Sequence, residues 1–427
     1  MPSSPNASRT GRASKPEGNR MGPLAGLKVV DLTHVMAGPT CTLMLADMGA
    51  EVIKIEKIPR GDDTRHSVPP KVGDQAASFL MMNRNKRGMA LDLKTAGGKA
   101  ILHRLIASAD VLVENFAPGS LERLGFAYED LRKDHPGLIY CSLSGFGRTG
   151  PYRERRGFDL VAQAMSGIMS FTGTGPDGPP LKSGAPLSDI TAGILGAMGI
   201  LAAYVHRLKT GEGQWVETSL FEAALVQTYW QSAIALATGV APRAMGSAHP
   251  LNAPYQAFEA EDGWIVIGGA NQTNWLRIVE AISAPELADD PRFKDGAARM
   301  GHLKELEAEL SARFRIKPAK HWLDLLDAKG VPCGPVYDML QALADPQTAA
   351  REMVVEVEHS TLGRVKTLGL PVKFSQTPGK VRTGAPLFGE HTREILAEHG
   401  FAREEIAAFE RERAVMSASA SANEKVA

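Results

Sequence analysis

One segment of the chain combines a single carboxylate with a run of turn-forming residues. It reads FTGTGPDGPP, runs from Phe171 to Pro180 and carries Asp177. Because glycine and proline at this density form neither a helix nor a central strand, Asp177 stands on a loop. A carboxylate can attack an acyl group to form a covalent intermediate, and the backbone amides of a glycine-rich turn can hold a developing oxyanion. Asp177 is therefore a candidate nucleophile, although Pro-Asp-Gly is also a common β-turn with no chemical role.

Strand-like and helix-like patterns alternate in the first part of the chain. The strand-like apolar runs are residues 27–32, 52–55, 89–93 and 111–113, and the helix-like segments are residues 39–48 and 96–107. This order indicates successive βαβ units. It predicts an α/β fold whose large domain has a parallel, Rossmann-like sheet covered by helices.

Parallel sheets bind ligands where their strands end. The turns after Leu32, Leu93, Val113 and Leu143 are therefore predicted to lie together. The turn after Leu32 has a single glycine and no GxGxxG pattern, which argues against a dinucleotide cofactor.

Four cations crowd around the strand-like run at residues 89–93. They are Arg84, Lys86, Arg87 and Lys94. Cations in this number suit the phosphates of a nucleotide, and they also suit an edge strand protected by charge. Both interpretations stay open on composition alone.

The overall composition limits the class of partner. The chain has 48 basic and 48 acidic residues, which argues against a nucleic-acid protein but leaves room for one local phosphate site. The three cysteines, Cys41, Cys141 and Cys333, are too few and too scattered for a disulfide framework or a zinc site. We expect no metal.

Neither a membrane span nor a secretory signal is predicted. The richest apolar run, residues 192–205, is shorter than the roughly 20 residues that a span needs, so we expect a core or interface helix there. Residues 1–21 are rich in Ser, Pro and Arg, which predicts a disordered extension. We expect a cytoplasmic protein. A transit peptide to an organelle matrix, or a true start at Met21, is the alternative.

Several further motifs accompany Asp177 along the chain. They are PLAGLKVVDLTHVMAGP (23–39), GAEVIKIEK (49–57), NRNKRGMALDLK (83–94), VENFAPGSLERLG (113–125), SGFGRTGPY (144–152), KTGEGQWVETSL (209–220), GVPCGPV (330–336) and GEHT (389–392). In this order they resemble the family III CoA-transferases, and the resemblance covers residues 22 to 410.

The resemblance implies two subunits threaded through one another as an interlocked homodimer. Each large domain is then built from both ends of the chain, with a smaller α+β domain between them. The implied segments are an extension (1–21), the first part of the large domain (22–225), a linker (226–245), the small domain (246–330), a return to the large domain (331–415) and a disordered tail (416–427).

The resemblance also implies which residues contact coenzyme A. These are Met36, Ala37, Lys57, Leu91, Asp92, Leu93, Lys94, Asn115, Phe116, Ala117, Arg123, Ser144, Gly145, Phe146 and Gly147. It places a mobile active-site loop near Gly246, Ser247 and His249, where the tetraglycine of formyl-CoA transferases is absent. His34 would lie near the coenzyme. Arg65 is a candidate clamp for the acceptor acid, because guanidinium matches carboxylate geometry.

The implied activity is CoA transfer from an acyl-CoA to a carboxylic acid, through an aspartyl anhydride and an aspartyl-CoA thioester. The words RAMGSAHP and PYQAF resemble enzymes that use succinyl-CoA and a second dicarboxylic acid. No redox cofactor is required; the CoA thioester is a substrate.

Two alternatives remain. A 2-methylacyl-CoA racemase of the same superfamily needs a His before Asp159, where this chain has Phe158, and a later acid, which would be Asp189. Under the transferase interpretation both acids are structural and cap helices. The other alternative is a CoA-binding protein without activity, which would have no use for Asp177.

Overall fold

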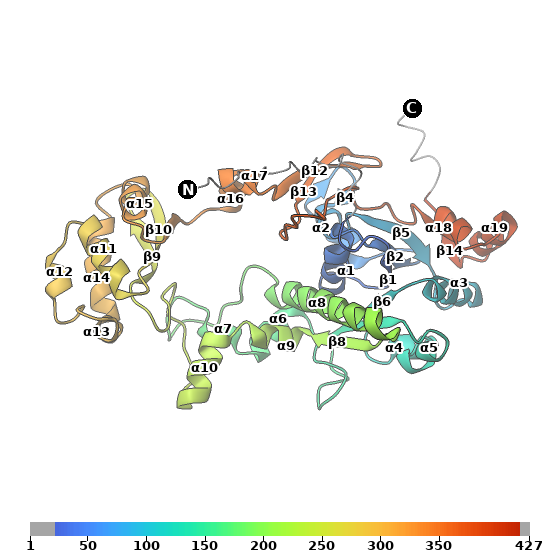
Figure 1. The fold of residues 1–427 in the computed structure, drawn as a ribbon, viewed down its shortest axis with the longest axis horizontal. Helices are drawn as coiled ribbons and strands as arrows, with labels where there is room; N and C mark the ends of the chain where they lie inside the picture. The colour runs from blue at the N-terminus through green and yellow to red at the C-terminus, as the bar shows by residue number, and fades with distance from the viewer. Residues whose placement is uncertain (1–21, 419–427) are drawn as a thin grey trace, which may run out of the picture. The chain divides into compact units, whose positions relative to one another are not determined.

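The computed structural model describes residues 22–418 of the chain (Figure 1). The chain forms two compact units. The first comprises residues 22–32, 42–113 and 355–418, and the second comprises residues 33–41 and 114–354. The beginning and the end of the described chain thus belong to one unit. The boundaries expected from the sequence for the linker (226–245), the small domain (246–330) and the return segment (331–415) remain predictions.

The sheet of the first unit has the strand order β14-β5-β2-β1-β6. Its strands are β1 (Lys28–Asp31), β2 (Glu51–Lys57), β5 (Lys86–Leu91), β6 (Val111–Glu114) and β14 (Val415–Met416). All neighbours are parallel except β14, which pairs antiparallel with β5. Helices α1 (Ala37–Asp47) and α3 (Ala96–Ala107) connect strands in two βαβ units. The predicted α/β fold is confirmed.

The remaining elements of the first unit are short. They are η1 (Asp63–His66), β3 (Lys71–Val72), β4 (Gln75–Ala76), α2 (Ala77–Met82), the paired strands β12 (Val354–His359) and β13 (Gly363–Leu368), α18 (Thr392–Glu398) and α19 (Arg403–Arg411). Residues 416–418, which we assigned to a disordered tail, are placed, since Met416 belongs to β14 and the Ala418 N–H donates to Gly389. The extension 1–21 and residues 419–427 lie outside the described residues.

The second unit pairs β7 (Ile139–Ser144) in parallel with β8 (Trp215–Ser219). The long helix α8 (Leu187–Thr210), green in Figure 1, packs against both strands. The other helices of this part are α4 (Ser120–Arg123), α5 (Tyr128–Asp134), α6 (Asp159–Met165), α7 (Ile168–Phe171), α9 (Leu220–Val226) and α10 (Tyr229–Thr238).

Glycines on one side of α8 allow its close packing. A Cβ atom added to Gly193 would lie 2.6 Å from the carbonyl oxygen of Ala37, and one added to Gly196 would meet Cys41 and Leu143 at 3.3 Å or more. The helix can therefore lie directly on the start of α1 and on β7. Within residues 22–418, α8 is the one helix that is long and apolar enough to cross a membrane. This is weak evidence for a membrane span, because the glycine face of α8 is buried in the unit.

Residues 253–331 of the second unit enclose a hydrophobic core of their own, with Trp275, Phe293 and Phe314 at its centre. It is built from β9 (Tyr255–Ala260), β10 (Gly263–Gly268), β11 (Cys333–Pro335), α11 (Gln272–Ala281), α12 (Glu286–Asp289), α13 (Gly296–Gly301), α14 (Leu303–Phe314) and α15 (Ala319–Ala328), and is followed by α16 (Met339–Ala344) and α17 (Pro346–Ala350). Strands β9 and β10 form a hairpin, and its turn is Glu261-Asp262 because Gly263 pairs with Ala260.

Candidate active site

A cavity of about 280 Å³ lies in the second unit, where β7 ends and where the segments that follow β1 and β6 begin. Its walls are His34, Val35, Met36, Ala37, Asn115, Phe116, Ala117, Pro118, Leu143, Ser144, Arg156, Gly157, Phe158, Asp189 and Leu220. Six of the residues that the resemblance implies for CoA contact are among them: Met36, Ala37, Asn115, Phe116, Ala117 and Ser144. Three of the four strand-end turns therefore meet as predicted.

The Asn115 side chain holds the backbone of His34 at this cavity by two hydrogen bonds. Its side-chain oxygen accepts a hydrogen bond from the His34 N–H (2.8 Å), and its side-chain nitrogen donates to the His34 carbonyl (2.8 Å). The His34 ring packs edge-on against Phe116 with 5.5 Å between ring centroids. The next residue, Val35, has a φ of +68°, which is a strained conformation for a β-branched side chain. Strain of this kind persists where the surrounding contacts determine the backbone, and the Asn115 bonds supply such contacts.

A contact between two glycine backbones positions another wall of the cavity. A Cβ atom on Gly145 would lie 2.7 Å from the Cα of Gly157, so only glycine allows this approach. The contact holds Arg156 to Phe158 against the end of β7. The Ser144 hydroxyl accepts from the Gly147 N–H (2.9 Å), and Gly145, Phe146 and Gly147 form this turn without lining the cavity.

Asp189 contributes a carboxyl group to the cavity from the first turn of α8. The start of this helix has no capping side chain of its own at Pro186. Instead, the Asp159 carboxylate accepts from the Ser188 N–H (2.8 Å) and the Asp189 N–H (3.4 Å). Gln163 donates to the other Asp159 oxygen (2.6 Å). Asp159 thus caps a helix, as expected of a structural acid, whereas Asp189 faces the cavity.

Burial, together with the neighbouring negative charge of Asp159, raises the pKa of Asp189 to about 7. Burial and a like charge both disfavour the ionised form of an acid. A carboxyl group with such a pKa changes charge near neutral pH, and perturbed acids in a cavity are typical of functional sites.

The structure places Asp177 outside this cavity. Residues 175–178 form a β-turn, in which the Gly178 N–H donates to the Gly175 carbonyl (3.2 Å), and the Asp177 side chain is exposed. The Gly246 N–H donates to Gly173 (3.0 Å), so this loop lies beside the predicted active-site loop. The plain β-turn interpretation of the sequence is thus what the backbone adopts. A catalytic role for Asp177 stays a prediction that the geometry does not favour.

The predicted loop at Gly246 is held by several contacts. The His249 ring stacks on Tyr255, with 5.0 Å between centroids, and lies edge-on to Trp230. Ser247 accepts a hydrogen bond from the Ala257 N–H (3.0 Å). Burial lowers the pKa of His249, which favours a neutral ring. The substrate roles of Gly246, Ser247 and His249 remain predictions.

Several predicted site residues already have partners within their own unit. Arg65 donates twice to Glu56 (2.7 Å each) and covers the Phe79 ring at 3.6 Å, so its guanidinium is engaged by a carboxylate of the fold. Lys57 pairs with Asp63 (2.8 Å) at the surface. Arg123 donates to Ser120 (3.1 Å).

The segment Leu91 to Lys94 closes the end of β5. The Asp92 carboxylate accepts from the Lys94 N–H (2.9 Å), and the Lys94 side chain is exposed. Its predicted contact with coenzyme A is untested, as are those of Lys57 and Arg123.

Three of the four cations around β5 form ion pairs with carboxylates of the fold. Arg84 pairs with Asp47 (2.6 Å), Lys86 with Asp31 (3.1 Å), and Arg87 with Glu398 (2.7 Å) among other carboxylates. Burial lowers the pKa of Lys86 to about 8. These ion pairs favour the interpretation of a strand protected by charge for Arg84, Lys86 and Arg87, while the phosphate site stays a prediction.

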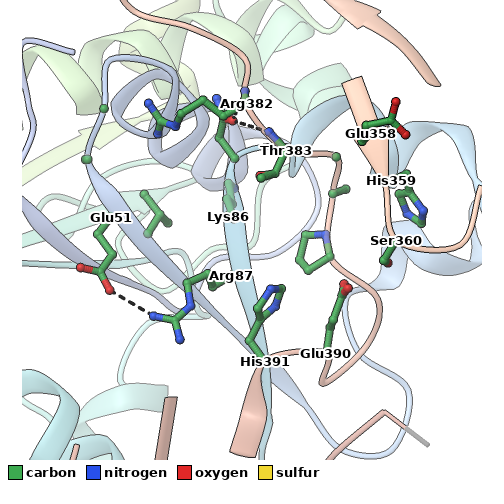
Figure 2. Close-up of a pocket in the computed structure, with 17 residues that line it drawn as sticks. Glu51, Lys86, Arg87, Glu358, His359, Ser360, Arg382, Thr383, Glu390 and His391 are labelled. Atoms are coloured by element: carbon green, nitrogen blue, oxygen red, sulfur yellow. Dashed lines mark hydrogen bonds and ion pairs between the residues drawn. The ribbon is translucent and has the colours of Figure 1, made fainter. Parts of the chain in front are cut away.

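A second cavity, of about 430 Å³, lies in the first unit (Figure 2). Charges of both signs face it, and Figure 2 shows Arg87 joined to Glu51 at one side while Glu390 and His391 stand at another. None of the residues that the resemblance implies for coenzyme A lines it. Within the described chain, no group of three His, Cys, Asp or Glu side chains is arranged to hold a metal. The expectation of no cofactor is untested.

The sequence analysis named Asp189 only as the acid of the racemase alternative or as a structural acid, and it gave no role to Arg156. Both residues line the first cavity. Asp189 follows a proline at the start of an apolar, glycine-rich helix, which is the kind of position where a buried helix end can present an acid.

Comparisons with known proteins agree with this fold. The model of CoA-transferase family III matches residues 24–392. A succinyl-CoA:glutarate CoA-transferase of Homo sapiens is 38% identical over 380 residues, which cover 89% of this chain and 86% of that protein. An acetyl-CoA:oxalate CoA-transferase of Acetobacter aceti is 44% identical over 374 residues, which cover 86% of this chain and 94% of that protein. A CAIB/BAIF family protein from Brucella suis, whose crystal structure is known, is 39% identical in sequence. Its structure matches with a TM-score of 0.80 over 89% of this chain and 100% of that chain.

The chain is an α/β enzyme of the CoA-transferase class. It belongs to CoA-transferase family III.

Proposed function

We propose that this enzyme moves CoA between two carboxylic acids with Asp189 as the covalent nucleophile. One observation supports this role most strongly: Asp189 is the single carboxylate among the described residues that line the cavity, which it shares with Met36 and Asn115. Asp177, the nucleophile expected from the sequence, stands on an exposed turn.

The proposed reaction conserves atoms and charge at each step. An Asp189 oxygen attacks the thioester carbonyl, the C–S bond breaks, and CoA departs as a thiolate, which leaves a mixed anhydride between the acyl group and Asp189. The thiolate then attacks the Asp189 carbonyl and releases the first acid as a carboxylate, leaving an aspartyl-CoA thioester. The acceptor carboxylate attacks the carbonyl of this thioester, which releases the CoA thiolate and forms a second mixed anhydride. The thiolate then attacks the acceptor's carbonyl in this anhydride, which yields the new acyl-CoA and free Asp189.

The pKa of Asp189 suits this role. The acid must be ionised to attack, and an oxygen whose pKa lies near 7 is more basic than an ordinary carboxylate while still being half ionised near neutral pH. Apolar walls such as Phe116 and Leu220 line the cavity, and apolar surroundings disfavour the water that would hydrolyse either intermediate.

Dicarboxylic acids are the proposed substrates. The related human protein is named for succinyl-CoA and glutarate, and the Acetobacter aceti protein for acetyl-CoA and oxalate. Racemisation is the alternative that must be excluded. Phe158 cannot transfer a proton, but His34 also lines the cavity and is a possible second acid/base group beside Asp189.

A homodimer is proposed as the working form. Large apolar side chains are exposed in the single chain on α10 and α16, including Tyr229, Trp230, Leu236, Met339 and Leu340. Exposed apolar surface of this extent is typical of protein interfaces. Light scattering of the purified protein should give twice the chain mass at micromolar concentration, and a monomer would contradict the proposal.

Mass spectrometry tests the proposed function directly. The enzyme is incubated with succinyl-CoA and, in turn, oxalate, malate and glutarate, and each mixture is analysed for a new CoA thioester. Digestion of the enzyme after reaction with succinyl-CoA alone should yield a CoA adduct on the peptide that contains Asp189. If no acid accepts CoA while deuterium from heavy water enters the α-carbon of a branched acyl-CoA, the racemase alternative replaces CoA transfer.

A further inference from the structure

Arg156 is the one lysine or arginine among the described residues that line the cavity with Asp189. Several of the other walls are apolar or backbone, such as Val35, Pro118 and Leu220. The cavity therefore combines one acid that can react with one permanent positive charge.

The arginines near Arg156 in the sequence already have partners. Arg148 pairs with Glu114 and Glu122, Arg153 pairs with Glu154 (3.4 Å), and Arg155 lies over the rings of Phe146 and Tyr152. In the part of the chain that the structure describes, the exposed Arg156 guanidinium makes no ion pair or hydrogen bond with a side chain. An arginine held at a cavity without a protein carboxylate is available to a ligand.

The backbone that carries Arg156 is fixed. Gly157 lies against Gly145, where a Cβ atom on Gly145 would come within 2.7 Å of the Gly157 Cα. Two residues further on, Asp159 caps α8 beside Asp189. The positive charge of Arg156 and the carboxylate of Asp159, which caps the helix that carries Asp189, are thus attached to one short, restrained segment.

The reaction uses only one carboxylate of each acid substrate. The second carboxylate of a dicarboxylic acid would be costly to bring into a cavity with apolar walls unless a positive group met it. A guanidinium meets a carboxylate with two parallel hydrogen bonds. We propose that Arg156 binds the second, non-reacting carboxylate and thereby selects dicarboxylic over monocarboxylic acids; this inference rests on the proposed function.

Matched pairs of substrates test the inference. The acceptors are glutarate and pentanoate, which have the same number of carbons but two and one carboxylates. The donors are succinyl-CoA and butyryl-CoA, which differ in the same way. In Arg156→Gln, KM for glutarate and for succinyl-CoA should rise about ten- to hundredfold, the usual effect of removing a hydrogen bond to a charged group. KM for pentanoate and butyryl-CoA should stay within about twofold.

Two further variants sharpen the result. Arg156→Lys keeps the charge but loses the two-point geometry, so its KM for glutarate should lie between those of the native enzyme and Arg156→Gln. Arg153→Gln removes an arginine of the same loop that does not line the cavity, and it should leave all four KM values unchanged.

Different failures have different meanings. If Arg156→Gln raises KM equally for succinyl-CoA and butyryl-CoA, Arg156 contacts the CoA portion and the inference is overturned. The same holds if the native enzyme uses glutarate and pentanoate equally well. In both cases CoA transfer itself stands. If the native enzyme transfers CoA to no acid, the proposed function falls, and the inference with it.

Discussion

Replacing Asp189 with asparagine should lower the rate of CoA transfer at least a thousandfold. Asparagine has nearly the same shape but no carboxylate oxygen to form the anhydride, and removal of a covalent nucleophile is among the largest losses that a single substitution causes. The measurement is the initial rate of glutaryl-CoA formation from succinyl-CoA and glutarate at saturating concentrations. The CoA adduct on the peptide that contains Asp189 should disappear as well.

Asp177→Asn is the matched control for this experiment. Its side chain is exposed on the turn between Gly175 and Gly178, so we expect the rate to remain within about threefold of the native value. The opposite pattern, with Asp177→Asn inactive and Asp189→Asn active, would restore the nucleophile expected from the sequence. Circular dichroism should show both variants folded, because both substitutions conserve volume.

Replacing Asp159 with asparagine should shift the pH dependence of transfer towards acid. In the native enzyme kcat/KM should rise with pH through about 7, because attack requires the ionised Asp189 and burial together with Asp159 raises its pKa to that value. Asparagine removes the like charge but keeps an oxygen that can accept from Ser188. The pKa of Asp189 should then fall, while burial keeps it above its ordinary value.

The measurement is kcat/KM between pH 5 and pH 9. The acid limb of the profile should move to lower pH, so the variant should keep a larger share of its activity at pH 6 than the native enzyme does. A loss of capping alone would lower the stability of the helix without moving this limb. An unchanged midpoint would therefore show that Asp159 has only a structural role.

The order of elements in the first unit could be predicted from the sequence because it depends on local patterns. Apolar runs such as residues 27–32 and the helical pattern at 96–107 report burial directly, and alternation of the two implies parallel strands. The meeting of the turns that carry Met36, Asn115 and Ser144 followed from the same topology.

The roles of individual charged residues could not be predicted in this way. By residue type and position, Lys86 and Arg65 are candidate ligand-binding cations, but in the structure they pair with Asp31 and Glu56. The partner of Lys86 lies far away in the sequence, so local patterns do not indicate it. Asp177 attracted attention because glycine and proline surround it locally. Asp189 has an ordinary helical neighbourhood, and only tertiary packing buries it.

The contact between Gly145 and Gly157 has a consequence for how this enzyme can change during evolution. It restrains one segment that supplies the proposed acceptor-binding charge at Arg156 and the α8 cap at Asp159. Any rearrangement of the segment that admits a differently shaped acid also moves the charge that raises the pKa of Asp189. Substrate preference and the pH at which the enzyme works are therefore coupled, and a shift in one should bring selection for compensating changes in the other.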